Sequence, residues 1–175
     1  SASASDPARV AQLQDSILMV HDLYIEHFPA TSKNPNNGCE VLADKANAYY
    51  DFYGKDSAFV ANAWLKQAVD CLGAEANAKT LSNYYITSFY AMKAMEGEAA
   101  QAKLAEMLTE YLTLVDYCDA AISSAIASED ERTAKVYEKV KGNIDQVFVT
   151  IADCDEMVPV LQVKYDEAPE DIVLL

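Results

Sequence analysis

The chain has 175 residues, which is long enough for one domain with a sizeable hydrophobic core. Apolar residues make up 51% of it, and only five Gly and five Pro interrupt it, which excludes a disordered or low-complexity protein. The 28 acidic residues outnumber the 13 Lys and Arg and give a formal net charge of −15. Such a surface should repel phosphate backbones and anionic lipid headgroups, so we expect no nucleic-acid partner.

The sequence contains no signal for membrane insertion. No apolar run approaches the roughly 20 residues that cross a bilayer, so we expect no transmembrane segment. The start, SASASDPARV, is small and polar like a mature terminus left after removal of a signal peptide. We therefore expect a secreted or extracellular-surface protein, with a cytoplasmic location as the alternative.

The first predicted helix begins at Asp6-Pro7, because an Asp side chain can cap free amide groups and Pro suits the first helical turn. Pro29 marks its end. Six apolar residues recur at steps of three and four along this helix, and we expect them to form one buried face: Val10, Leu13, Ile17, Val20, Tyr24 and Phe28.

Residues 31–38, TSKNPNNG, form the densest turn signal and predict an exposed loop. A second helix is expected over 39–53, and Gly54-Lys55-Asp56 breaks it. A third helix, capped by Asp56 or Ser57, reaches at least Leu72. Residues 74–95 are helix-prone, and Gly97 lies in a connection or a kink.

The second half of the sequence shows the clearest helical periodicity. One buried face is predicted for Leu104, Leu108, Tyr111, Val115, Cys118, Ile122 and Ala125. Ser128 and Glu131 have the spacing of a capping box, which predicts the start of a last long helix that ends at Pro159. Its apolar face contains Val136, Val140, Ile144, Val147, Ile151, Cys154 and Val158.

The ends of the chain have weaker patterns. We expect residues 1–5 to be a flexible N-terminus and residues 160–175 an irregular acidic tail, which could pack on the helices, pair as a strand or stay loose. The sequence has no internal repeat and no convincing run of alternating strands. It therefore predicts an all-α antiparallel bundle of about five to six helices in one domain over 1–175.

Four cysteines would allow two disulfides in three connectivities in a secreted protein. Cys39 and Cys71 are almost equidistant from the Gly54 turn and are the favoured pair. The remaining pair, Cys118 with Cys154, is out of register by about 20 Å, because a hairpin turning near Ser128 places residue 118 opposite about residue 139. Cys71–Cys118 with Cys39–Cys154 remains an alternative, as do buried free thiols at Cys118 and Cys154.

No catalytic or metal-binding constellation is recognisable. His21 and His27 are six positions apart and lie on different helix faces. The sequence lacks GxSxG, HExxH, Glu-x-x-His and a Gly-rich phosphate loop, and no two cysteines are closer than 32 positions. We therefore expect no catalytic residue, no cofactor and no metal.

Aromatic residues gather in two clusters, and these are the candidate binding surface or pocket. The first contains Tyr49, Tyr50, Phe52 and Tyr53, and the second Tyr84, Tyr85, Phe89 and Tyr90. Clustered Tyr can line a ligand cavity or form a protein-binding patch. Alternatively, these residues lie at the boundary of the core with their hydroxyl groups in water.

The leading hypothesis is a noncatalytic, secreted or surface-displayed helical protein that binds another macromolecule through helix faces and the loop 31–38. A carrier of a small apolar ligand in the bundle core is a second hypothesis. A proteinaceous enzyme inhibitor is a third, because a helical bundle with two disulfides resembles in outline the plant invertase and pectin methylesterase inhibitors. An intracellular helical scaffold with four reduced thiols is the fourth.

Overall fold

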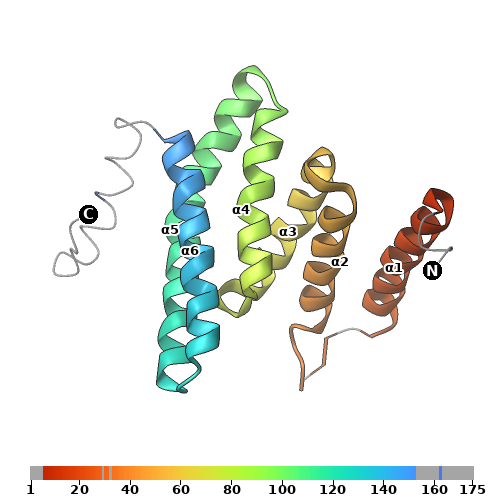
Figure 1. Ribbon diagram of the computed structural model, residues 1–175, viewed down its shortest axis with the longest axis horizontal. Helices are drawn as coiled ribbons and strands as arrows, with labels where there is room; N and C mark the ends of the chain where they lie inside the picture. Colours follow the sequence, from red (N-terminus) through yellow and green to blue (C-terminus); the bar gives the residue numbers. More distant parts are fainter. Residues whose placement is uncertain (1–5, 29, 32, 153–161, 163–175) are drawn as a thin grey trace. The chain divides into compact units, whose positions relative to one another are not determined.

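The computed structural model of the protein describes residues 6–28, 30–31, 33–152 and 162. They form, in chain order, α1 (Pro7–His27), α2 (Asn37–Tyr53), the 3-10 helix η2 (Gly54–Ser57), α3 (Ala58–Leu72), the 3-10 helix η3 (Gly73–Glu75), α4 (Ala78–Lys93), α5 (Gly97–Ala127) and α6 (Glu131–Ile151) (Figure 1). None of these residues lies in a strand, and the predicted all-α class with antiparallel neighbouring helices is confirmed. No described helix is long and apolar enough to cross a membrane.

The chain divides into two compact units, Ser1–Thr87 and Ser88–Leu175, and the boundary lies within α4. The first unit contains α1, α2, α3 and most of α4, and the second contains the end of α4, α5 and α6. The expectation of one domain over 1–175 stays a prediction. The segments 1–5 and 160–175 lie outside the described residues, except for Gln162.

In the first unit, α2 and α3 form an antiparallel hairpin around η2. Gly54 has φ 62° and Gly73 has φ 55°, a left-handed backbone that side chains rarely adopt, so these glycines end the two helices. Ser57 precedes α3, and its hydroxyl group donates to the Gly54 carbonyl at 2.7 Å instead of capping α3. The core between the helices is rich in small side chains, which allow a close approach: Ala43, Ala46, Ala58, Ala61 and Ala68.

A buried polar network ties α4 to α2 and α3 within this unit. The Asn47 amide donates to the Thr80 hydroxyl at 3.0 Å, and the Asn83 amide donates to the Asn47 side-chain oxygen at 2.9 Å. On α3, the Asn62 amide donates to the Thr87 hydroxyl at 3.3 Å. Because a buried amide without partners is costly, these paired groups favour one register of the three helices.

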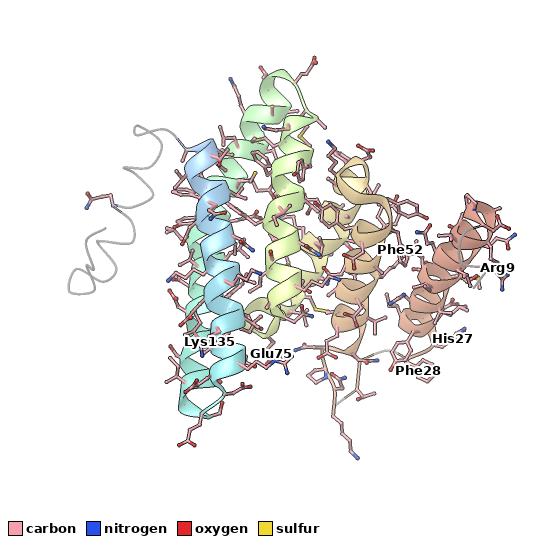
Figure 2. The ribbon with its side chains drawn as sticks, in the orientation of Figure 1. Arg9, His27, Phe28, Phe52, Glu75 and Lys135 are labelled. Carbon is pink, nitrogen blue, oxygen red and sulfur yellow. A yellow bond between two sulfur atoms is a disulfide. The ribbon has the colours of Figure 1, made fainter. Side chains whose placement is uncertain are left out.

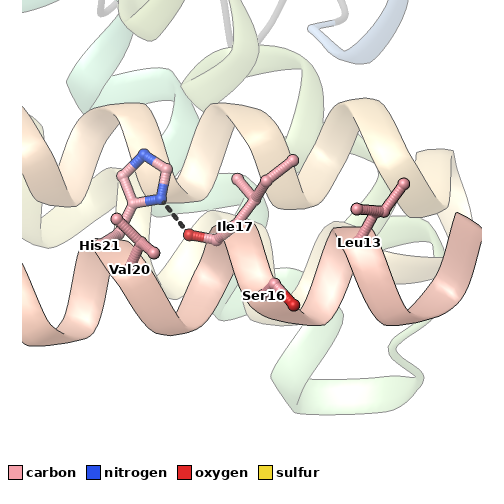
Figure 3. Close-up of a pocket in the computed structure, with 5 residues that line it drawn as sticks. All are labelled: Leu13, Ser16, Ile17, Val20 and His21. Atoms are coloured by element: carbon pink, nitrogen blue, oxygen red, sulfur yellow. Dashed lines mark hydrogen bonds between the residues drawn. The ribbon is translucent and has the colours of Figure 1, made fainter.

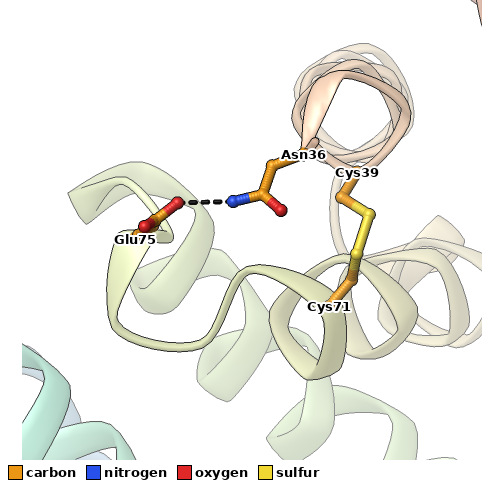
Figure 4. The surroundings of a disulfide bond; sticks show 4 residues. All are labelled: Asn36, Cys39, Cys71 and Glu75. Atoms are coloured by element: carbon orange, nitrogen blue, oxygen red, sulfur yellow. Dashed lines mark hydrogen bonds between the residues drawn. A yellow bond between two sulfur atoms is a disulfide. The ribbon is translucent and has the colours of Figure 1, made fainter. Parts of the chain in front are cut away.

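Cys39, near the start of α2, is joined to Cys71, near the end of α3, with their Cα atoms 6.1 Å apart (Figure 4). The prediction from the hairpin geometry is therefore confirmed for this pair. Beside the disulfide, the Asn36 amide donates to the Glu75 carboxylate (Figure 4). The alternative set, Cys71–Cys118 with Cys39–Cys154, is therefore wrong. Cys118 is a buried free thiol, as the other alternative predicted, and Cys154 lies outside the described residues.

In the second unit, α5 and α6 form a long antiparallel hairpin with the register expected from the sequence. Lys141 bonds to both carboxylate oxygens of Asp119, at 2.7 and 2.8 Å. The Tyr111 ring stacks on the Phe148 ring with centroids 3.8 Å apart. These pairs place residue 118 opposite about residue 141, because the numbers of facing residues have a nearly constant sum. Five residues of the predicted apolar faces are buried, and Val136 is exposed; the buried ones are Val115, Cys118, Ala125, Val140 and Ile144.

The start of α6 differs from the capping box expected at Ser128. The Ser128 hydroxyl group donates back to the Ser124 carbonyl at 3.0 Å and so finishes α5. Glu129 then turns the chain with φ 59°, and Asp130 caps α6 by accepting from the Thr133 amide at 3.0 Å. The cap lies two residues later than predicted because Ser128 and Glu129 form the turn between the helices. The helix ends at Ile151, and the predicted positions Cys154 and Val158 lie outside the described residues.

Candidate functional site

The feature that sets α1 apart is a row of apolar side chains exposed to solvent. The helix begins as predicted, with the Asp6 carboxylate accepting from the Ala8 amide at 3.0 Å and Pro7 in the first turn. It ends with the Phe28 amide donating to the Tyr24 carbonyl at 2.9 Å. Figure 2 shows Arg9 near one end of α1 and His27 and Phe28 at the other.

We name the row the α1 stripe and define it as Val10, Leu13, Ile17, Val20, Tyr24 and Phe28. Its members are between 36% and 59% exposed, and α1 contains no buried residue. The expectation that this face is buried is therefore wrong for the described part of the chain. The periodicity correctly located one apolar face but could not show which neighbour, if any, covers it.

A different side of α1 holds it against α2. The Asp22 carboxylate and the Lys45 ammonium group lie 2.5 Å apart. The Asn37 amide donates to the Phe28 carbonyl at 2.8 Å and fixes the C-terminal end of α1. Desolvation and the nearby Asp15 carboxylate raise the pKa of Tyr53 on α2. These polar contacts connect α1 to α2, and Leu18 and Ile25 are the half-buried apolar residues of α1.

The α1 stripe and these polar contacts lie on roughly opposite sides of the helix. Asp15 and Asp22 are separated by two turns and share a side. At 100° per residue, the centre of the α1 stripe is about 160° away from them, and Glu26 lies close to their side. All three acidic residues inside α1 are thus kept away from the stripe. Its edges carry Gln14, Ser16, His21 and Leu23, none of them acidic.

Leu13, Ser16, Ile17, Val20 and His21 line a shallow, mainly apolar depression on α1 (Figure 3). His21 Nδ1 is hydrogen-bonded to the Ile17 carbonyl at 2.7 Å, which directs the imidazole along the helix (Figure 3). All five lining residues belong to one helix. The depression is therefore a surface on which another element could pack, and its shape gives no support to an enclosed site for a small ligand.

The first predicted aromatic cluster takes part in packing between α2 and α3. The Tyr49 ring lies 5.0 Å from the Trp64 ring and 4.8 Å from the Tyr53 ring, measured between centroids. Tyr50 and Phe52 are half-buried, and Tyr53 is exposed. In this cluster, Tyr53 therefore offers the most open surface, next to α1.

The second cluster is divided between the two units. Tyr84 and Tyr85, in the first unit, are buried, so they are core residues and not a contact surface. Phe89 and Tyr90, in the second unit, are half-buried, with ring centroids 5.5 Å apart. All four residues lie on α4, where two are buried and two are half-buried.

Sequence reasoning missed a buried lysine at the junction of the first three helices. Lys45 is only 9% exposed, and its ammonium group lies 4.1 Å from the centroid of the Trp64 ring and pairs with Asp22. The ring face and the carboxylate together compensate the charge. Its position one helical turn before Tyr49 was the available signal, since residues four apart share a face.

The loop 31–38 is shorter than expected because α2 already begins at Asn37. The Asn34 amide donates to the Thr31 hydroxyl at 3.1 Å, and Lys33, Asn34 and Pro35 are exposed.

Across residues 6–28, 30–31, 33–152 and 162, no group of three or more His, Cys, Asp or Glu could hold a metal ion. No protein-family model, curated protein or solved structure matches the chain.

Proposed function

We propose that the protein is a noncatalytic helical binding protein and that it contacts a protein partner through the α1 stripe. The exposure of the α1 stripe carries this proposal. A contiguous row of large apolar side chains in water is costly, and on a folded protein such surfaces mark sites where another molecule packs. The spacing suits a partner that contributes a helix or an apolar groove, since the anchors repeat at three and four residues.

The chemistry around the α1 stripe supports a protein partner. Three of its four edge residues, Gln14, Ser16 and His21, are polar and none is acidic, while Asp15 and Asp22 contact α2. An apolar centre with a polar edge is the usual arrangement of a protein interface. Tyr24 and Phe28 at one end add large aromatic anchors, and aromatic residues are enriched among the residues that contribute most to binding.

A charge-matched pair of variants tests the proposal. Ile17→Glu places a carboxylate in the middle of the α1 stripe, whereas Met19→Glu adds the same charge on a different side of α1, where Met19 is 56% exposed. Quantitative affinity capture from the fluid or cell extract of the natural source would compare the two with the wild type. We expect a partner that wild type and Met19→Glu retain equally and that Ile17→Glu loses by at least about tenfold.

Circular dichroism should show equal helix content in both variants, so that loss of binding is not loss of folding. Equal recovery of every captured protein by wild type and Ile17→Glu would refute the assignment of the α1 stripe as the binding surface.

A further inference from the structure

One cation and three aromatic rings lie together on α2 and α3, where α1 approaches these helices. We name this surface the Lys45 face and define it as Lys45, Tyr49 and Tyr53 on α2 and Trp64 on α3. The Lys45 ammonium group lies 4.1 Å from the centroid of the Trp64 ring. The Tyr49 ring lies 4.8 Å from the Tyr53 ring and 5.0 Å from the Trp64 ring. An ammonium group beside rings that exclude water suits a carboxylate ligand.

Helix α1 meets the Lys45 face with two carboxylates. Asp22 pairs with Lys45 at 2.5 Å. Desolvation and the neighbouring Asp15 carboxylate raise the pKa of Tyr53. The two aspartates are about 10 Å apart along α1, and Lys45 and Tyr53 are about 12 Å apart along α2, so both pairs form at matching heights. Helix α1 therefore contacts this face as a helical ligand would, through two acids that are two turns apart.

The ion pair between the two helices is buried on one side only. The Asp22 side chain is 60% exposed, whereas the Lys45 side chain is 11% exposed. No residue of α1 is buried, and a segment with few buried contacts opens at a low cost in free energy. A buried ammonium group that loses its carboxylate is costly. When α1 moves away, Lys45 therefore favours an external carboxylate in the place of Asp22.

We infer that the Lys45 face is a binding site for an acidic helix of another protein and that α1 is its displaceable internal occupant. The partner helix presents two carboxylates two turns apart, in the positions that Asp15 and Asp22 now hold. Tethered α1 opposes this binding at an effective concentration on the order of millimolar, so the contact is autoinhibitory. Screening at physiological salt confines the repulsion from the net charge of −15 to about 8 Å. The Lys45 face is distinct from the α1 stripe, so this inference does not depend on the proposed function.

A fluorescently labelled peptide of residues 6–28 tests the inference, because it presents both aspartates in the spacing of α1. Fluorescence anisotropy would measure its binding to the full chain at physiological salt. Asp22→Asn in the full chain weakens the internal occupant and leaves the Lys45 face unchanged. The peptide should bind this variant at least about tenfold more tightly than the wild type. Glu26→Gln removes the same charge from an exposed position of α1 and should behave like the wild type.

A second peptide separates the Lys45 face from the α1 stripe. With Asp15→Asn and Asp22→Asn it keeps every apolar residue of the stripe but lacks both acids. It should bind the Asp22→Asn chain at least about tenfold more weakly than the unmodified peptide. Adding Lys45→Met to that chain should weaken binding of the unmodified peptide by a similar factor, with circular dichroism showing unchanged helix content.

Three results would overturn the inference. The first is no saturable binding of the unmodified peptide to the Asp22→Asn chain at concentrations up to about 500 µM. The second is equal affinity of this peptide for the wild-type and Asp22→Asn chains. The third is equal binding of both peptides, which would assign the interaction to the α1 stripe and leave the proposed function standing.

Discussion

The Cys39–Cys71 disulfide should make a large contribution to the stability of the first unit. The perturbation is the double substitution Cys39→Ser with Cys71→Ser. The two residues are 32 positions apart, and closing a loop of that length removes enough entropy from the unfolded chain to contribute about 4 kcal/mol. Cys71 is exposed and Cys39 half-buried, so the substitution leaves no cavity in the core to add to the loss.

Urea unfolding followed by circular dichroism would measure the loss, and wild-type protein kept reduced should unfold like the double variant. Asn36→Ala is the matched control, because it removes the hydrogen bond to Glu75 at the same end of the hairpin without cutting a cross-link. We expect that control to cost about 1 kcal/mol. A double variant within about 1 kcal/mol of the oxidised wild type would refute the loop-closure reasoning.

Three further outcomes are expected in the second unit. Ile144→Ala should lower the free energy of unfolding by about 2–5 kcal/mol in urea titration, because the side chain is 1% exposed and its removal leaves a cavity. Burial and the hydrogen bond to Asp145 raise the pKa of Tyr111 above the value of about 10 that a tyrosine has in an unfolded chain. The fold favours the protonated phenol, so the free energy of unfolding should fall as the pH rises above about 10. Urea denaturation at a series of pH values should show this fall in the wild type but not in Tyr111→Phe. Burial and the Asp119 carboxylate raise the pKa of the Cys118 thiol to about 11, so mass spectrometry should find it unalkylated by iodoacetamide at about pH 8 until urea unfolds the chain.

The amino-acid sequence by itself determined where most helices begin and end, because those signals are local. Asp6 and Pro7 start α1, and Gly54 and Gly73 end α2 and α3, through groups within a few residues. The hairpin register was predictable to within a few residues for the same reason: once the turns are known, counting residues places Cys39 beside Cys71 and residue 118 opposite about residue 139.

The environment of each helix face depended on the tertiary structure. Periodicity showed that α1 has an apolar stripe, but the tertiary structure decided that the stripe is exposed and that Asp22 pairs with Lys45 on α2. In the same way, Tyr84 and Tyr53 looked alike as members of aromatic clusters, yet Tyr84 is buried and Tyr53 is exposed. The hydrophobic effect is not directional, so an apolar face shows that burial is favourable but not what covers the face. That depends on residues distant in the sequence.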